Sequence, residues 1–193
     1  MNALTQMITQ QLAGGAVRTI SQRLGVSETT ANTAVQIAVP LILSALARNA
    51  AQPQGAESLH EAISKDHDGS ILNNLTDYLG DPQSANGAGI LGHVFGSQTP
   101  TLENNLAQAT GMDQSSASGL LETIAPIVMG ALGKEQQQNG LSASDLANLL
   151  GSQQQQAETT APDLMSMLGS MLDQNQDGSA IDDLKRMAAN FSK

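Results

Sequence analysis

The sequence contains no cysteine and no tryptophan, and its few aromatic residues are Tyr78, Phe95 and Phe191. Without cysteine, the chain has no disulfides, no thiolate catalysis and no cysteine-ligated metals. With so few aromatics, a core must be built from Leu, Ile, Val, Met and Ala, a mixture that favours packed helices over sheets. Apolar residues make up 40% of the 193 residues, so the chain is long enough for a sizeable globular core.

Basic residues are also scarce. The chain has 8 Lys and Arg residues against 18 Asp and Glu residues, which gives a formal net charge of -10 at pH 7. A charge of this sign opposes binding to nucleic acid and to anionic membrane surfaces. We therefore expect neither to be a partner of this protein.

Long apolar runs are missing as well. The N-terminal stretch, residues 1–15, has neither the basic start nor the sustained apolar run of a secretory signal. The longest uncharged apolar stretch, residues 33–47, contains Pro40 and is short for a membrane span. Such a length is more typical of a buried core helix. These features predict a cytoplasmic protein that does not insert into membranes, and they leave an association with the cell envelope open.

The chain repeats itself. Residues 25–48 (GVSETTANTAVQIAVPLILSALAR) align with residues 111–134 (GMDQSSASGLLETIAPIVMGALGK), so that glycine meets glycine and Pro40 meets Pro126. The match continues through a polar break, an amphipathic stretch and a DGS motif, at residues 50–55, 56–64 and 65–75 in the first copy and 135–140, 142–151 and 175–184 in the second. Chance rarely places these features in one order twice. We predict a single domain, residues 1–193, with an internal duplication into halves of about 1–80 and 87–193 and a Gln-rich loop at about 152–160.

Local signals make the repeated units helical. Apolar residues recur at steps of three and four in Leu4, Met7, Ile8 and Leu12, the spacing of one helix face. No alternating pattern typical of a strand occurs in the sequence. The fold class predicted is therefore all-α: a multihelical domain of two related halves.

The repeated helices also carry their own boundaries. Gly25 and Gly111 are suited to the left-handed residue that ends a helix, and two residues later Ser27 and Asp113 are suited to cap the next one. Pro40 and Pro126 fall within long helical segments, where each removes one backbone hydrogen bond and favours a kink. We expect both prolines to be buried in two proline-kinked core helices.

The duplicated helix with its proline, the GILGHVFG segment (89–96) and the DGS turn resemble the YidB-like family of bacterial proteins, a domain of unknown function numbered 937. The resemblance spans most of the chain and rests on Gly, Ala and Leu patterns. It implies a multihelical fold with internal repeats, and it implies no activity.

The sharpest candidate site is the stretch DQNQDGSAIDDL (173–184), which begins like an EF-hand calcium loop. Its candidate metal ligands are Asp173, Asn175, Asp177, Ser179 and Asp182. The loop should close with a glutamate at the twelfth position, where this chain has Leu184, so any calcium affinity should be weak. The competing interpretation makes Ser179 a helix cap with Asp182 in the first turn. The first DGS copy is similar, with Ser70 after Asp66 and Asp68, and we favour the helix start in both.

Residues 18–37 have the outline of a helix-turn-helix, with Gly-Val-Ser between two helical segments. A DNA reader needs base-contacting and basic residues at the start of its second helix, where this chain has Glu28, Thr29 and Thr30. Two packed helices joined by a tight turn are the better interpretation.

Three histidines complete the candidates. His60 and Glu61 begin like the zinc-protease motif HExxH, but the fifth position is Ser64. His60, His67 and the aspartates next to His67 are close enough in sequence to hold a metal loosely, although solvated loop residues explain them better. His93 is predicted at the edge of a small packing helix within residues 89–96.

The chain contains no recognisable catalytic constellation. We therefore expect a non-enzymatic protein with a structural or protein-interaction role, which recognises an unknown protein partner through apolar grooves between helices. The alternative is weak calcium binding by loop 173–184, in the envelope or the external medium where calcium is abundant. A hydrolase that uses unrecognised residues is a third class with little support. No cofactor is expected apart from weakly bound Ca²⁺.

Overall fold

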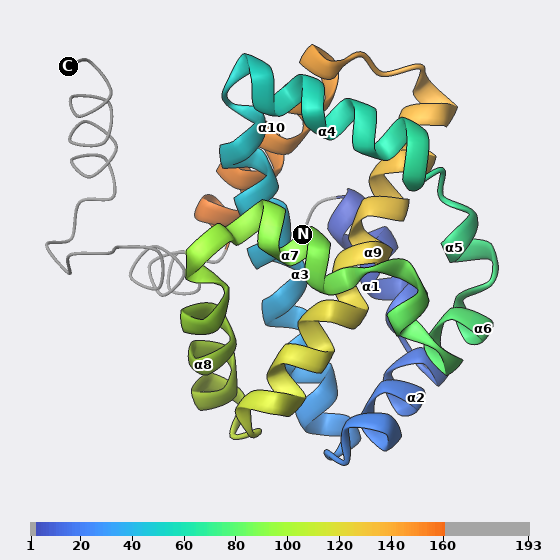
Figure 1. Cartoon of the computed structure of the whole chain (residues 1–193), viewed down its shortest axis with the longest axis vertical. Helices are drawn as coiled ribbons and strands as arrows, with labels where there is room; N and C mark the ends of the chain where they lie inside the picture. The colour runs from blue at the N-terminus through green and yellow to red at the C-terminus, as the bar shows by residue number, and fades with distance from the viewer. Residues whose placement is uncertain (1–2, 161–193) are drawn as a thin grey trace, which may run out of the picture.

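The computed structural model describes residues 3–160 of the chain, and side chains up to residue 155. Ten α-helices and two short 3₁₀-helices make up this part, which contains no strand, so the all-α prediction is confirmed there (Figure 1). In chain order they are α1 (Ala3–Leu12), α2 (Gly15–Leu24), α3 (Glu28–Ala50), α4 (Pro53–Asp66), α5 (Ser70–Asn73), α6 (Leu75–Gly80), η1 (Pro82–Ala85), α7 (Gly87–Phe95), η2 (Gly96–Gln98), α8 (Thr99–Thr110), α9 (Gln114–Asn139) and α10 (Ala143–Thr160).

Helices α3 and α9 form the centre of the fold. They pack against each other, and the shorter helices surround them (Figure 1). Both are buried on nearly every side in their middle turns, including residues 41–47 of α3 and 123–133 of α9. The core consists of Leu, Ile, Val, Met and Ala side chains with only Tyr78 and Phe95 as buried aromatics among the described residues. Small alanine side chains on both central helices let neighbouring backbones come close.

The predicted helix boundaries are confirmed at two corners. Gly25 (φ 68°) ends α2 and Gly111 (φ 73°) ends α8, both in the left-handed conformation that glycine adopts without strain. The Ser27 hydroxyl then accepts a hydrogen bond from the Thr30 N–H at the start of α3. The Asp113 carboxylate accepts one from the Ser116 N–H at the start of α9. Each corner thus satisfies backbone groups that the helix ends would leave unpaired.

The two prolines lie inside the central helices as predicted, but their environments differ. Pro126 in α9 is buried, whereas Pro40 in α3 is only half-buried. Because proline has no N–H, it leaves the carbonyl of the residue four positions earlier without a helical partner. For Pro126 this residue is Glu122, and Gly87, the first residue of α7, packs directly against the Glu122 carbonyl; a methyl group on Gly87 would overlap that oxygen.

Two polar stretches differ from the prediction. The Gln-rich loop expected at about 152–160 is instead the last part of α10, and the polar break expected at 135–140 is helical up to Asn139, where Gly140 (φ 62°) ends α9. Glutamine is a good helix former. The polarity of this stretch was therefore not a sufficient reason to predict a loop. Gln153 is buried in α10, which packs against α3 and α4. Its side-chain oxygen has no hydrogen-bond partner.

Helices α3 and α9 are also long and apolar enough to cross a membrane by length and composition. Within the protein, however, 67% of the most apolar window of α3 and 83% of that of α9 are buried. Core helices of globular proteins pass the same test, so it gives only weak evidence for a membrane span.

Candidate functional site

A groove of about 820 Å³ opens where the end of α4 meets α5, α6, η1 and the start of α7. Its volume lies in the range of ligand-binding clefts. Four aspartates line it: Asp66, Asp68, Asp77 and Asp81. Its apolar residues come from other turns of the same elements, namely Ile71, Ala85 and Ile90 beside the ring of Tyr78. No Lys or Arg is among its lining residues.

The turn between α4 and α5 forms one wall, and two glycines allow it to lie directly on α9. Gly133 faces the end of α4, where a methyl group would overlap the His67 carbonyl oxygen and lie 2.8 Å from its carbon. Gly69 takes a left-handed conformation (φ 87°), and a methyl group there would lie 2.9 Å from the β-carbon of Lys134. The wall is therefore fixed by backbone contacts to the most buried part of the core.

Asp68 begins α5 by a side-chain hydrogen bond. Its carboxylate accepts the Ser70 N–H at 2.9 Å, and hydrogen bonds from the Ser70 side chain and backbone lower the pKa of Asp68. The sequence predicted a helix start at this motif, which is confirmed, but it assigned the cap to Ser70. The structure places Ser70 as the first helical residue and gives the acceptor role to Asp68. A carboxylate near a helix start also interacts favourably with the helix dipole.

His67 is the half-buried titratable group of the groove. Burial lowers the pKa of His67, and the neighbouring Asp66 carboxylate opposes this only in part. His67 is therefore mainly neutral at pH 7, and the charge of the groove comes from its four carboxylates. Asp66, Asp68, Asp77 and Asp81 are all exposed to solvent.

Tyr78 anchors the floor of the groove to α9. Its hydroxyl donates a hydrogen bond of 2.8 Å to the Thr123 carbonyl oxygen, and the side chain is buried. Burial raises the pKa of Tyr78 above its usual value, so the phenol stays neutral and keeps its proton. On the outer side of α6, Arg23 donates a hydrogen bond to the Leu79 carbonyl and ties α2 to this region.

The two serine hydroxyls of the groove are each hydrogen-bonded to a neighbouring aspartate residue. The Ser84 hydroxyl donates to the Asp81 carbonyl oxygen, and Ser70 interacts with Asp68 rather than with His67. Between residues 3 and 155, the structure also brings together no group of three His, Asp or Glu side chains that could hold a metal ion. The groove is thus characterised by its four carboxylates and by its shape.

The candidate calcium ligands Asp173, Asn175, Asp177, Ser179 and Asp182 lie outside the described residues. In the described first copy, the loose set formed by His60 and the residues around His67 does not form a metal cluster. Ser64, which stands where HExxH has its second histidine, donates to the His60 carbonyl and accepts from Gln136 of α9. It serves as a contact between helices α4 and α9.

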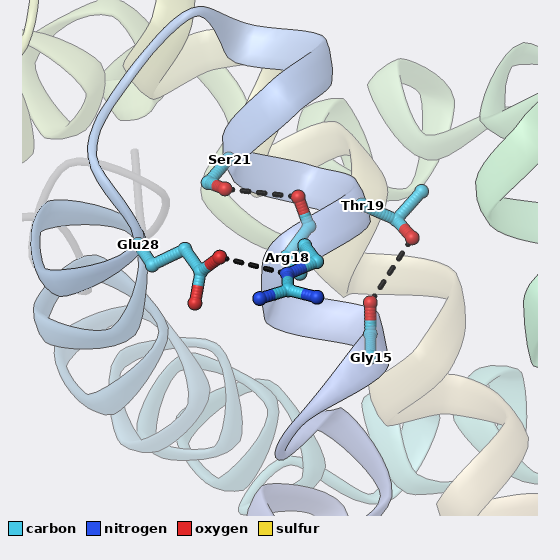
Figure 2. A network of polar contacts seen from close by, with 5 residues as sticks. All are labelled: Gly15, Arg18, Thr19, Ser21 and Glu28. Atoms are coloured by element: carbon cyan, nitrogen blue, oxygen red, sulfur yellow. Dashed lines mark hydrogen bonds and ion pairs between the residues drawn. The ribbon is translucent and has the colours of Figure 1, made fainter.

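The helix-turn-helix outline is a packed corner (Figure 2). Arg18 of α2 pairs with Glu28, the first residue of α3, with 2.9 Å between Nε and Oε1. Ser21 and Thr19 donate to carbonyls of α2 itself, at Arg18 and Gly15. The arginine at this corner is thus already paired with an acid, as Figure 2 shows.

His93 has the position predicted for it. It is exposed on α7, while Leu91 and Phe95 of the same helix are buried in the core. Sequence patterns had not pointed to Asp77 and Asp81, because neither belongs to a motif. Only the DYLGDP stretch (77–82), with two acids around a Gly turn, marks this part of the chain.

Comparison with known proteins gives a family and nothing more specific. A family model described as a bacterial protein of unknown function, DUF937, matches residues 6–135, which include every element that lines the groove. The resemblance noted in the sequence is thereby confirmed. No curated protein and no solved structure matches the chain.

Proposed function

The chain belongs to DUF937, a family of bacterial proteins of unknown function, and we propose that it is a non-enzymatic protein-interaction module that binds a basic helical segment of a partner protein in the α4–α7 groove. The observation that carries the proposal is the composition of the groove: four exposed carboxylates together with the apolar side chains Ile71, Ala85 and Ile90, without a Lys or Arg among the lining residues.

The physical argument rests on two kinds of contact. Exposed carboxylates attract a basic segment over distances of about 10 Å at moderate salt and orient it on approach. The apolar side chains, including Ile71 and Ile90, then supply a surface to bury, which contributes most of the affinity. An amphipathic helix with cations beside its apolar face suits both features.

Other classes of function have less support. A net charge of -10 and a paired Arg18 disfavour nucleic-acid binding. Extensive burial of α3 and α9 supports a protein that does not insert into membranes, and we propose a cytoplasmic location. The serine hydroxyls of the groove contact the Asp68 carboxylate and the Asp81 carbonyl rather than a histidine, which supports a non-enzymatic role.

Weak calcium binding by loop 173–184 is the alternative function. The first DGS motif supports a different role for these loops, because its Asp68 carboxylate accepts a backbone N–H that begins α5. We therefore propose that the second DGS motif also begins a helix and that calcium is not required for the fold.

We also propose that the domain arose by duplication, with kinked helices α3 and α9 as equivalent elements. The support lies in the matched corners: Gly25 and Gly111 end the preceding helices in the same conformation, and Ser27 and Asp113 cap the central ones with the same hydrogen bond.

The test of the groove is a binding titration on the full-length protein. The probe is a fluorescently labelled amphipathic peptide of Leu, Lys and Ala, with a second peptide in which Glu replaces Lys. We expect the cationic peptide to bind and Asp77→Lys with Asp81→Lys to weaken binding on the order of tenfold, because each reversed rim charge costs up to about 1 kcal/mol. Glu57→Lys, at an exposed site outside the groove on α4, is the matched control and should leave binding unchanged. Equal affinity for both peptides, or equal loss in the control variant, would refute the proposal.

A further inference from the structure

The end of the chain has the opposite charge to the groove. Residues 184–193 (LKRMAANFSK) contain three of the 8 basic residues of the protein, Lys185, Arg186 and Lys193, and no acid. Leu184, Met187, Ala188 and Phe191 recur at the spacing of one helix face. A cationic and amphipathic segment therefore lies in a chain whose overall charge is -10.

This segment has the chemistry that the groove selects. The groove presents carboxylates without any Lys or Arg of its own, and beside them the apolar side chains Ile71, Ala85 and Ile90. In a helix, this segment would carry an apolar stripe on one face, Lys185 at its flank and Arg186 on the polar side, so it matches both the apolar surface and the charge of the groove.

The chain is long enough for the contact to form within one molecule. The described part of α10 reaches Thr160, and residues 161–183 lie between it and the basic segment. Fully extended, that stretch spans about 75 Å, which exceeds the roughly 40 Å diameter of a domain of this size. Attachment to the same chain also raises the effective concentration of the segment at the groove to about the millimolar range.

We propose that residues 184–193 dock in the α4–α7 groove of their own chain and compete with the basic segment of a partner protein. This inference rests on the proposed function of the groove. It makes the C-terminus an internal regulator, because a partner must displace it in order to bind. The apparent affinity for a partner is then the intrinsic affinity multiplied by the fraction of molecules in which the groove is free.

The absence of cysteine allows a direct test on the full-length protein. A nitroxide spin label attached at Ser192→Cys should broaden the backbone amide signals of Asn74 and Asn86, which line the groove, and leave Gly111 at the α8–α9 corner unaffected. The effect should not depend on protein concentration and should disappear when Lys185→Glu and Arg186→Glu are added. No selective broadening would refute docking. Broadening seen only between labelled and unlabelled molecules would refute docking within one chain.

Competition distinguishes this inference from the function on which it rests. The variant with Lys185→Glu and Arg186→Glu should bind the cationic probe peptide about tenfold more tightly than the wild type, if the segment occupies the groove about nine-tenths of the time. Unchanged affinity for a peptide that does bind the wild type would overturn the inference and leave the groove function intact. If neither protein binds the peptide, the groove function itself fails.

Discussion

Gly133→Ala offers the most demanding test of how the groove is built. At most exposed positions within a helix, replacing glycine by alanine stabilises a protein by about 0.4–1 kcal/mol, because alanine restricts the unfolded chain. At Gly133 the added methyl group would overlap the His67 carbonyl oxygen and approach its carbon to 2.8 Å. Both atoms belong to the backbone, so no change of side-chain rotamer can relieve the overlap.

The end of α4 must therefore move away from α9. Overpacking of this kind typically costs about 1–3 kcal/mol. Even after the helix-propensity gain, we expect Gly133→Ala to lower the free energy of unfolding by about 2 kcal/mol. For a chain of this length that corresponds to a fall in melting temperature of roughly 4–8 °C. Since His67 lines the groove, the probe peptide should also bind more weakly.

Gly92→Ala is the matched control. Gly92 lies inside α7, and a methyl group there meets no atom within 4 Å. We expect this variant to be as stable as the wild type or slightly more stable. Urea denaturation followed by circular dichroism measures both differences. The explanation of the groove wall would be refuted if Gly133→Ala were as stable as Gly92→Ala, because the tight backbone contact would then not exist.

Two further predictions concern a buried hydrogen bond and the second DGS motif. Tyr78→Phe should lower the free energy of unfolding by about 1–2 kcal/mol, measured by urea denaturation, because it leaves the Thr123 carbonyl without the phenol donor; an unchanged stability would contradict the bond seen at 2.8 Å. In thermal unfolding, millimolar calcium should not change the melting temperature of the wild type, and Ser179→Ala should cost about 1 kcal/mol as a lost cap while Asp173→Ala costs little. A calcium-dependent rise of several degrees that disappears in Asp173→Ala, with magnesium ineffective, would instead establish the calcium site.

The parts of the fold that sequence predicted well are those set by local chemistry. Gly25 followed by Ser27, and Gly111 followed by Asp113, define helix ends within a few residues, so their corners could be recognised without knowledge of the tertiary structure. The same local logic located α7 and placed His93 on its exposed side.

The predictions that were wrong concern features that depend on tertiary packing. The Gln-rich stretch was assigned to a loop because it is polar, yet α10 packs against α3 and α4 and holds Gln153 in the interior. Packing thus decided the structure of a segment whose helix propensity was already adequate. Pro40 was expected to be buried like Pro126, but the two surroundings differ although the local sequences match.

The groove could not have been predicted, because its lining residues, all between 66 and 90, belong to several short elements whose arrangement is set by tertiary contacts. Asp68 comes from the turn after α4, Asp77 from α6 and Asp81 from the residue before η1. The position of the α4–α5 turn depends on Gly69 and Gly133, because a side chain at either residue would not fit between this turn and α9. A glycine that permits a close tertiary contact has no sequence signal that separates it from a glycine in open space, such as Gly92.

The contacts that hold the groove on α9 affect the binding proposed for it. One wall is held on α9 by backbone contacts at Gly133, the floor is held by the bond from Tyr78, and Gly87 fits α7 against the Glu122 carbonyl. All three attachments are to a single buried helix, so the groove is fixed before any ligand arrives. A binding surface ordered in advance avoids the entropy cost of ordering its own residues, and only the incoming segment loses freedom. If that segment belongs to the same chain, the entropy that it loses on association is smaller as well. If residues 184–193 dock as proposed, a partner protein must exceed them in apolar area or positive charge in order to displace them.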